Sequence, residues 1–108
     1  MQIGSEIAPT STAYWFYACS NCASIDLTGI DSSKVTDMSF MFYGCRNRAL
    51  NIIGVNVLDT KNVEYMSCMF QSCKWLKSLD VSKFNTEKVK DMNGMFNSCG
   101  VTSLDVSN

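Results

Sequence analysis

The chain has 108 residues, 46% of them hydrophobic and 18% charged, with a formal net charge of −1 at pH 7. This composition is typical of one folded domain, and the nine basic residues, scattered singly, argue against a nucleic-acid-binding protein. No apolar run approaches the ~20 residues of a membrane-spanning helix, and no signal peptide is visible at the N-terminus. Histidine is absent, which excludes the usual Ser–His and Cys–His nucleophilic pairs.

One string of eleven residues occurs three times, after a weaker first copy. The weak copy is "PTSTAYWFYAC" (9–19), and the regular copies are "VTDMSFMFYGC" (35–45), "VEYMSCMFQSC" (63–73) and "VKDMNGMFNSC" (89–99). The cysteines that end the four copies are 26, 28 and 26 residues apart. A period of this length is typical of a solenoid, in which equivalent residues of successive coils stack on one another.

The apolar residues of each copy are spaced as on one face of a helix. In 35–45 they lie at positions −3, 0, +3, +4 and +7 relative to Met38. We therefore predict a short helix in each copy, preceded by an Asp/Asn–Ser/Thr pair that suits a turn or a helix cap. Stacked helices would form three core ladders, namely Met38/Met66/Met92, Met41/Met69/Met95 and Phe42/Phe70/Phe96. A soft-metal or ligand site made by the methionines is the alternative, and the helical spacing favours the core.

A second pattern, L-x-x-L-x-L, follows each cysteine. Its members are Cys22/Ile25/Leu27, Leu50/Ile53/Val55, Leu76/Leu79/Val81 and Val101/Leu104/Val106. In "SLDVS" (78–82) apolar and polar residues alternate, which predicts a half-buried strand with Leu79 and Val81 pointing inward. The second copy needs two extra residues in "RNRA" (46–49), where we expect a surface turn. Each unit is therefore strand, turn, short helix and turn, and successive strands are parallel.

Six cysteines raise the question of disulfides. Cys19, Cys45, Cys73 and Cys99 are equivalent in the repeat, so their side chains would point the same way rather than at one another. We predict buried thiols that act as small apolar residues and as weak donors to turn backbone. The motif "CSNC" (19–22) occurs once and gives only weak support to zinc or redox chemistry, so neither a metal site nor a cofactor is expected.

The outward side chains of the predicted strands form the candidate binding face. They are Ser24, Asp26, Thr28, Ile52, Gly54, Asn56, Ser78, Asp80, Ser82 and Asp105. Curved solenoids use the sheet side for recognition, although a merely solvated sheet has the same composition. Asp80 and Asp105 would be neighbours at about the spacing of two glycosidase carboxylates, so a carbohydrate-active enzyme is a weaker alternative. Trp75, Tyr43 and Tyr65 lie outside the core pattern and are candidate anchors for a partner, or packing residues of neighbouring turns.

The unit "LKSLDVSKFNTEKVKDMNGMFNSC" (76–99) resembles the 26-residue repeat of bacterial surface proteins. This is the BspA-like class of leucine-rich repeats, which also occurs in mycoplasma-type and Listeria-type surface lipoproteins. The resemblance covers residues 9–108, and its most specific element is V-x-x-M-x-x-M-F-x-x-C. It implies an α/β repeat fold, a leucine-rich-repeat-like right-handed solenoid with a parallel β-sheet on one face and short helices on the other. The predicted single array (1–108) consists of an N-terminal partial or capping coil (1–24), three repeats (25–52, 53–78, 79–103) and a truncated last strand (104–108).

The resemblance also implies a role in adhesion or interaction at the extracellular cell surface. We therefore expect a non-enzymatic interaction module from a larger surface protein, with a host or bacterial surface protein or a glycan as its partner. A structural spacer that projects another domain is the alternative. The strand at 101–107 would end the array with unpaired backbone groups, which predicts an end-to-end homodimer through this strand.

Overall fold

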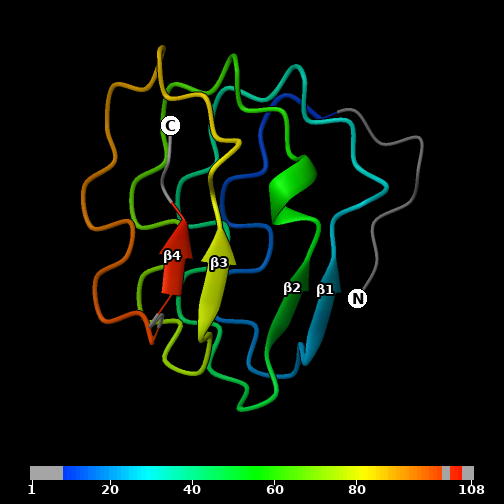
Figure 1. Ribbon diagram of the computed structural model, residues 1–108, viewed down its shortest axis with the longest axis vertical. Coiled ribbons are helices and arrows are strands. Elements are labelled where there is room, and N and C mark those ends of the chain that lie inside the picture. The colour runs from blue at the N-terminus through cyan, green and yellow to red at the C-terminus, as the bar shows by residue number, and fades with distance from the viewer. Residues whose placement is uncertain (1–8, 101–102, 106–108) are drawn as a thin grey trace.

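The structure is a computed structural model that describes residues 9–100 and 103–105 (Figure 1). Most of this part of the chain consists of turns. Its regular elements are β1 (Ser24–Asp26), β2 (Asn51–Ile53), the 3₁₀ turn η1 (Val55–Val57), β3 (Ser78–Asp80) and β4 (Ser103–Asp105). The molecule measures 31 × 28 × 21 Å along its principal axes, so it is a compact particle rather than an elongated one.

The predicted leucine-rich-repeat-like solenoid is wrong. The described residues contain no α-helix, and their strands form two separate parallel pairs, β1–β2 and β3–β4, instead of one continuous sheet. After β2 the chain turns into η1, and β2 does not pair with β3 (Figure 1). The observed fold is therefore a small globule with few strands and almost no helix.

The segments predicted as helices are successive tight turns, because their backbone N–H groups have other partners. In 35–45 the N–H of Met41 donates to the carbonyl of Met38, three residues back, at 3.3 Å. The N–H groups of Phe40 and Phe42 instead donate to the carbonyls of Ser67 and Met69, both at 2.9 Å, in the next copy of the string. An α-helix would need those N–H groups for carbonyls four residues back in the same segment. Apolar spacings of three and four residues fit consecutive turns as well as a helix.

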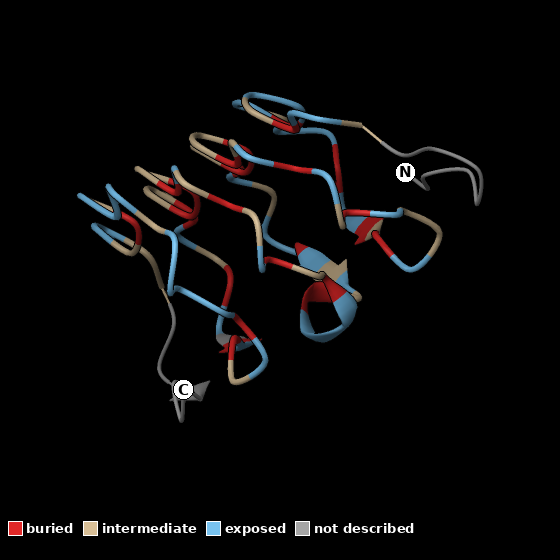
Figure 2. Cartoon of the chain, turned by 90° about the horizontal axis from the view of Figure 1, so that it is seen from above, coloured by how far each residue is buried: buried red, intermediate tan, exposed pale blue. Residues whose placement is uncertain are grey.

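Single-residue parallel bridges hold these turn segments side by side. They join Ser11 to Asp37, Asp37 to Tyr65, and Tyr65 to Asp91. Figure 2 shows the successive turns of the chain next to one another, each with a buried stretch. Backbone polar groups inside the molecule are thus paired between segments, as burial requires.

Each turn segment contains two residues with left-handed backbone conformation. These residues are Tyr14, Ala18, Phe40, Gly44, Cys68, Ser72, Gly94 and Ser98, with φ between 53° and 70°. An L-residue other than glycine pays a steric cost in this region because its Cβ approaches the following carbonyl. Glycine occupies the second of the two positions only in 35–45, at Gly44.

Replacing Ser72 with glycine is expected to raise the free energy of unfolding by about 0.5 kcal/mol, because relief of the left-handed strain outweighs the added freedom of the unfolded chain. Urea unfolding followed by circular dichroism measures this change. Ser67→Gly is the matched control, since Ser67 has no positive φ and the same substitution there is expected to destabilise by about 0.5–1 kcal/mol. Equal effects of both substitutions on the free energy of unfolding would contradict the assignment of left-handed strain to Ser72.

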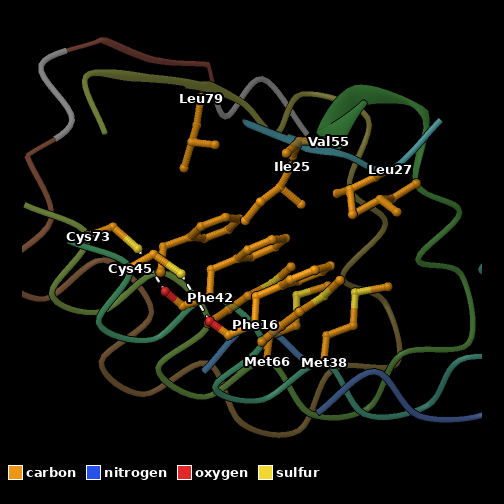
Figure 3. Packing of buried hydrophobic residues seen from close by; sticks show 14 of the residues in the cluster. Phe16, Ile25, Leu27, Met38, Phe42, Cys45, Val55, Met66, Cys73 and Leu79 are labelled. Atoms are coloured by element: carbon orange, nitrogen blue, oxygen red, sulfur yellow. Dashed lines mark hydrogen bonds between the residues drawn. The ribbon is translucent and has the colours of Figure 1, made fainter. Parts of the chain in front are cut away.

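Most of the predicted core positions are buried, and the exposed exceptions are Met92 in the last segment and Ile53 in β2. The rings of Phe16, Phe42, Phe70 and Phe96 stack in that order, with centroid distances of 5.5, 5.3 and 5.7 Å (Figure 3). The buried methionines are Met38, Met41, Met66, Met69 and Met95. Met92 is 43% exposed, so its predicted place in the core is wrong. No described turn segment lies beyond 89–99 to cover it.

The register of β2 differs from the prediction by one residue. Ile25 of β1 pairs with Ile52, and Asp26 pairs with Ile53. Ile52 packs against the core whereas Ile53 is 40% exposed, which reverses the predicted directions of these two side chains. Because side chains alternate along a strand, a slip of one residue exchanges its two faces. The following Gly54 adopts φ 93° and begins η1, which returns Val55 to the interior.

The Asp/Asn–Ser/Thr pairs are predicted to suit either a turn or a helix cap. They form turns, and no α-helix follows them in the described residues. The N–H of Ser33 donates to Asp31 Oδ1 at 3.0 Å, which closes an Asx turn. The second residue of the pair connects neighbouring segments. Ser32 Oγ accepts the N–H of Asp59, and Thr60 Oγ1 accepts the N–H of Asn85, both at 2.7 Å.

Two expectations concern the ends of the chain and its relation to a membrane. β4 pairs with β3 in parallel, with Leu104 opposite Leu79. The rest of the strand predicted at 101–107 lies outside the described residues, so the end-to-end homodimer stays a prediction. Within the described ranges, no helix is long and apolar enough to cross a bilayer.

Candidate functional site

The predicted binding face does not form one continuous surface, because the strands that would carry it belong to two separate pairs. Ser24, Thr28, Asn56 and Asp80 are exposed, and Asp26, Ile52, Gly54 and Ser82 are partly buried. The side chains of Ser78 and Asp105 lie outside the described part of the structure. On the backbone, Asp80 is opposite Asp105, as predicted, and Ser24 is opposite Asn51.

The two aspartates of this face whose side chains are described, Asp26 and Asp80, are engaged in local turns. Asp26 Oδ1 accepts the N–H of Thr28 at 2.9 Å and the hydroxyl of Thr28 at 2.6 Å. Asp80 Oδ1 accepts the equivalent pair of bonds from Ser82. The hydroxyl bond first, and the backbone bond second, lower the pKa of each carboxyl. A glycosidase acid needs a raised pKa, so Asp80 is unsuited to that role.

The six cysteines comprise one disulfide, two buried thiols and two partly exposed thiols. Cys99 is one of the partly exposed thiols, so its predicted burial is wrong. Cys19 and Cys22 form a disulfide across a short turn, with their Cα atoms 5.6 Å apart, so the predicted free thiol at Cys19 is wrong. Cys19 and Cys22 are three residues apart and are not equivalent in the repeat, so their side chains can turn toward each other. Cys45 donates to the Phe16 carbonyl at 3.1 Å and Cys73 donates to the Phe42 carbonyl at 2.9 Å, which confirms the predicted role of these two thiols (Figure 3).

The thiols are expected to react with iodoacetamide at pH 8 in an order set by burial. Cys68 and Cys99 are partly exposed and react first. Cys73 is buried, and the hydrogen bond with Cys45, together with desolvation, raises the pKa of its thiol, so little thiolate is present to react. Peptide mass spectrometry over time measures each rate. Labelling of Cys73 as fast as Cys68 in the folded chain would contradict this order, and labelling in urea is the control.

Four aromatic side chains form an exposed cluster, which we call the aromatic patch: Tyr14, Tyr17, Phe40 and Tyr43. The ring centroids of Tyr14 and Phe40 are 4.9 Å apart and those of Tyr17 and Tyr43 are 5.1 Å apart, and both pairs are nearly parallel. The two pairs adjoin, since Tyr14 and Tyr17 are separated by 5.4 Å. Tyr14 and Tyr17 remain 54% and 48% exposed. The patch exists because the turns at 9–19 and 35–45 lie side by side.

Basic side chains converge around Trp75 from two turns. Arg48 Cζ lies 5.0 Å from the centre of the Trp75 ring, Lys74 Nζ lies at 5.2 Å and Lys77 Nζ lies at 5.5 Å, all within range of cation–π attraction. A hollow of about 550 Å³, here called the basic hollow, is lined by Arg46, Arg48, Ser72, Lys74, Trp75 and Ser98.

The basic hollow corrects the expectation that the basic residues are scattered. They are scattered in the sequence, but the fold brings the turn at 46–49 next to the turn at 72–75. The signal that could have located it is the insertion "RNRA", which adds two arginines at the one point where the repeat changes length. Among the described residues, no group of three or more Cys, Asp or Glu side chains is arranged to hold a metal ion.

Together, the fold and these two clusters define a small, turn-rich domain with exposed aromatic and basic surfaces. Residues 10–108 match the family described as "Mycoplasma protein of unknown function, DUF285". The chain belongs to this family, which agrees coarsely with the predicted bacterial surface-repeat family and does not confirm the BspA-like leucine-rich-repeat assignment. No curated protein matches the chain. No solved structure matches it either.

Proposed function

We propose that the chain is a non-enzymatic interaction module of a larger bacterial cell-surface protein, with the aromatic patch as its contact surface for a protein partner. The observation that carries the proposal is the exposure of Tyr14 and Tyr17 in two adjoining ring stacks. Tyrosine is enriched at interaction hot spots because a large ring with few rotatable bonds is ordered at low entropic cost.

The backbone beneath the patch favours binding without rearrangement. The N–H of Tyr14 donates to the Ser39 carbonyl at 3.2 Å, and the N–H of Phe16 donates to the Met41 carbonyl at 2.9 Å. These bonds connect the two turns that carry the rings, so the stacks are already ordered before a partner arrives. A preorganised surface loses less conformational freedom on association.

A structural spacer is the second candidate function. The continuous bridges from Ser11 to Asp91 favour it, because backbone bonds between all four turn segments make a stiff unit. A spacer needs no partner at the aromatic patch. Substitution of the patch tyrosines would therefore remove binding by an interaction module and would leave a spacer unchanged.

The test is a microarray of purified secreted and membrane proteins that is incubated with the labelled chain and with its Tyr14→Asn/Tyr17→Ser variant. Asparagine is chosen for position 14 because it tolerates the left-handed conformation there. We expect a set of spots bound by the parent chain and lost with the variant. Matched thermal unfolding temperatures show that both chains are folded.

Tyr65→Ala is the control variant, since Tyr65 is 41% exposed and lies outside the patch. It is expected to retain the spots that the patch variant loses. Binding that all three chains share equally, or no binding by any of them, would overturn the proposed partner surface and favour the spacer.

A further inference from the structure

Among the described residues that line the basic hollow, three are positively charged and none is acidic. The ion pairs between described side chains are Lys61–Asp59 and Lys90–Glu64, and neither involves a cation of the hollow. Arg46, Arg48 and Lys74 come from turns 26 or more residues apart and line one shallow space. Like charges at such a site repel one another, and an anion placed between them removes that cost.

The remaining lining of the basic hollow is suited to a sugar. Trp75 is partly buried, with Arg48, Lys74 and Lys77 over its ring. The part of the indole that remains exposed is an apolar surface of the kind that packs against the C–H groups of a pyranose ring. Ser72 and Ser98 place hydroxyl-bearing side chains at the same hollow. Hydroxyls donate and accept hydrogen bonds, so they pair with the hydroxyl groups of a saccharide.

We propose that the basic hollow binds an acidic saccharide through its sulfate or carboxylate groups, with Trp75 as the platform for the sugar ring. Arg48 and Lys74 pair with the acidic groups, and the cation–π contacts hold their charges beside the ring. This site is independent of the aromatic patch, because the two clusters share no residue.

The size of the cluster favours a saccharide over a nucleic acid. A nucleic-acid surface needs a stripe of cations that follows a phosphate backbone, and several stacking rings. Here three cations and one indole line a single hollow on a chain of net charge −1. The insertion that supplies Arg46 and Arg48 occurs once in the sequence, so the chain carries one such site.

The experiment measures binding of a heparin-derived hexasaccharide by the fluorescence of Trp75, in a Trp15→Phe background that leaves Trp75 as the sole tryptophan. Chitohexaose is the uncharged saccharide and a six-nucleotide single-stranded DNA is the competing polyanion. We expect saturable binding of the sulfated hexasaccharide, weaker binding at higher salt, and no binding of chitohexaose.

Arg48→Gln/Lys74→Gln is expected to weaken hexasaccharide binding at least about tenfold, because two charge-assisted contacts are lost. Lys34→Gln/Lys83→Gln is the matched control: it removes the same charge from exposed residues that do not line the hollow, and it is expected to change affinity less than about twofold. Trp75→Leu, followed by calorimetry, is expected to weaken binding at unchanged net charge.

Three results would overturn the proposal. One is equal affinity of the Arg48→Gln/Lys74→Gln and Lys34→Gln/Lys83→Gln variants for the sulfated hexasaccharide, which would mean diffuse electrostatic binding. Another is equal binding of chitohexaose and the sulfated hexasaccharide. The third is tighter binding of the DNA than of the hexasaccharide, which would assign the hollow to nucleic acid. Loss of saccharide binding in the Tyr14→Asn/Tyr17→Ser variant would contradict the independence of the two sites.

Discussion

Replacing Phe42 with alanine is expected to lower the free energy of unfolding by about 3–5 kcal/mol, the largest effect of any single substitution considered for this chain. The Phe42 ring has no exposed surface and is stacked between Phe16 and Phe70, at centroid distances of 5.5 and 5.3 Å. Truncation removes its buried apolar area and leaves a cavity between two rings. The neighbouring backbone hydrogen bonds prevent the turns from closing over it, so the cavity cost is retained.

Phe96→Ala provides the matched control for this prediction. Phe96 stacks on one ring, that of Phe70, and is only partly buried, so its truncation is expected to cost about half as much. Urea unfolding of both variants, followed by circular dichroism at the same temperature, measures the difference. Equal losses of stability at the two positions would show that the stack is not the centre of the core.

The Phe42→Ala variant also connects stability with the two proposed sites. Phe42 precedes Tyr43 of the aromatic patch and lies four residues before Arg46 of the basic hollow. Because one turn segment supports both surfaces, loosening it is expected to weaken binding at both, whereas the Tyr14/Tyr17 and Arg48/Lys74 variants affect one site each.

Replacing Thr60 with valine is expected to lower the free energy of unfolding by about 1–3 kcal/mol, although the two side chains have nearly the same shape. The Thr60 side chain is buried, and its hydroxyl both accepts the N–H of Asn85 at 2.7 Å and donates to the Asn85 carbonyl at 3.2 Å. Valine leaves this N–H without its acceptor at the contact between two turn segments. Asn85 is exposed and this hydrogen bond is part-buried. The N–H, screened from water by Thr60 and left without an acceptor, therefore loses part of the hydration it had in the unfolded chain.

Thr86→Val is the control for this substitution, because Thr86 is exposed, and it is expected to change stability by less than about 0.5 kcal/mol. Hydrogen exchange of the Asn85 amide gives a local reading: the amide is expected to exchange faster in Thr60→Val than in the parent chain. Unchanged exchange and unchanged stability would mean that the inter-segment bond contributes nothing net.

Much of the core could be predicted from the repeated string alone. The spacing of Met38, Met41 and Phe42 identifies side chains that share one side of the chain, and burial follows because their apolar surface must leave water. The Asp–Ser and Asp–Thr pairs were recognisable as turns, because a short polar side chain can bond its own backbone two residues on. Such arguments depend on local chemistry and hold whatever the segments pack against.

The helices, the single sheet and the binding face could not be predicted correctly in this way. The apolar spacing in 35–45 does not determine whether the N–H of Phe42 donates to a carbonyl of its own segment or to that of Met69 in the next segment. The first arrangement is a helix and the second is a row of turns. The register of β2 was decided by the left-handed turn at Gly54, which places Ile52 inward.

The sequence by itself thus determined most of the buried side chains, the turns that close on their own side chains, and the recurrence of one segment. Only the tertiary structure decided the partners of the backbone hydrogen bonds between turn segments, because these join residues 25 or more positions apart. The same long-range pairing stacks Tyr17 on Tyr43 and brings Arg48 to Trp75. Both proposed sites therefore exist only in the folded chain.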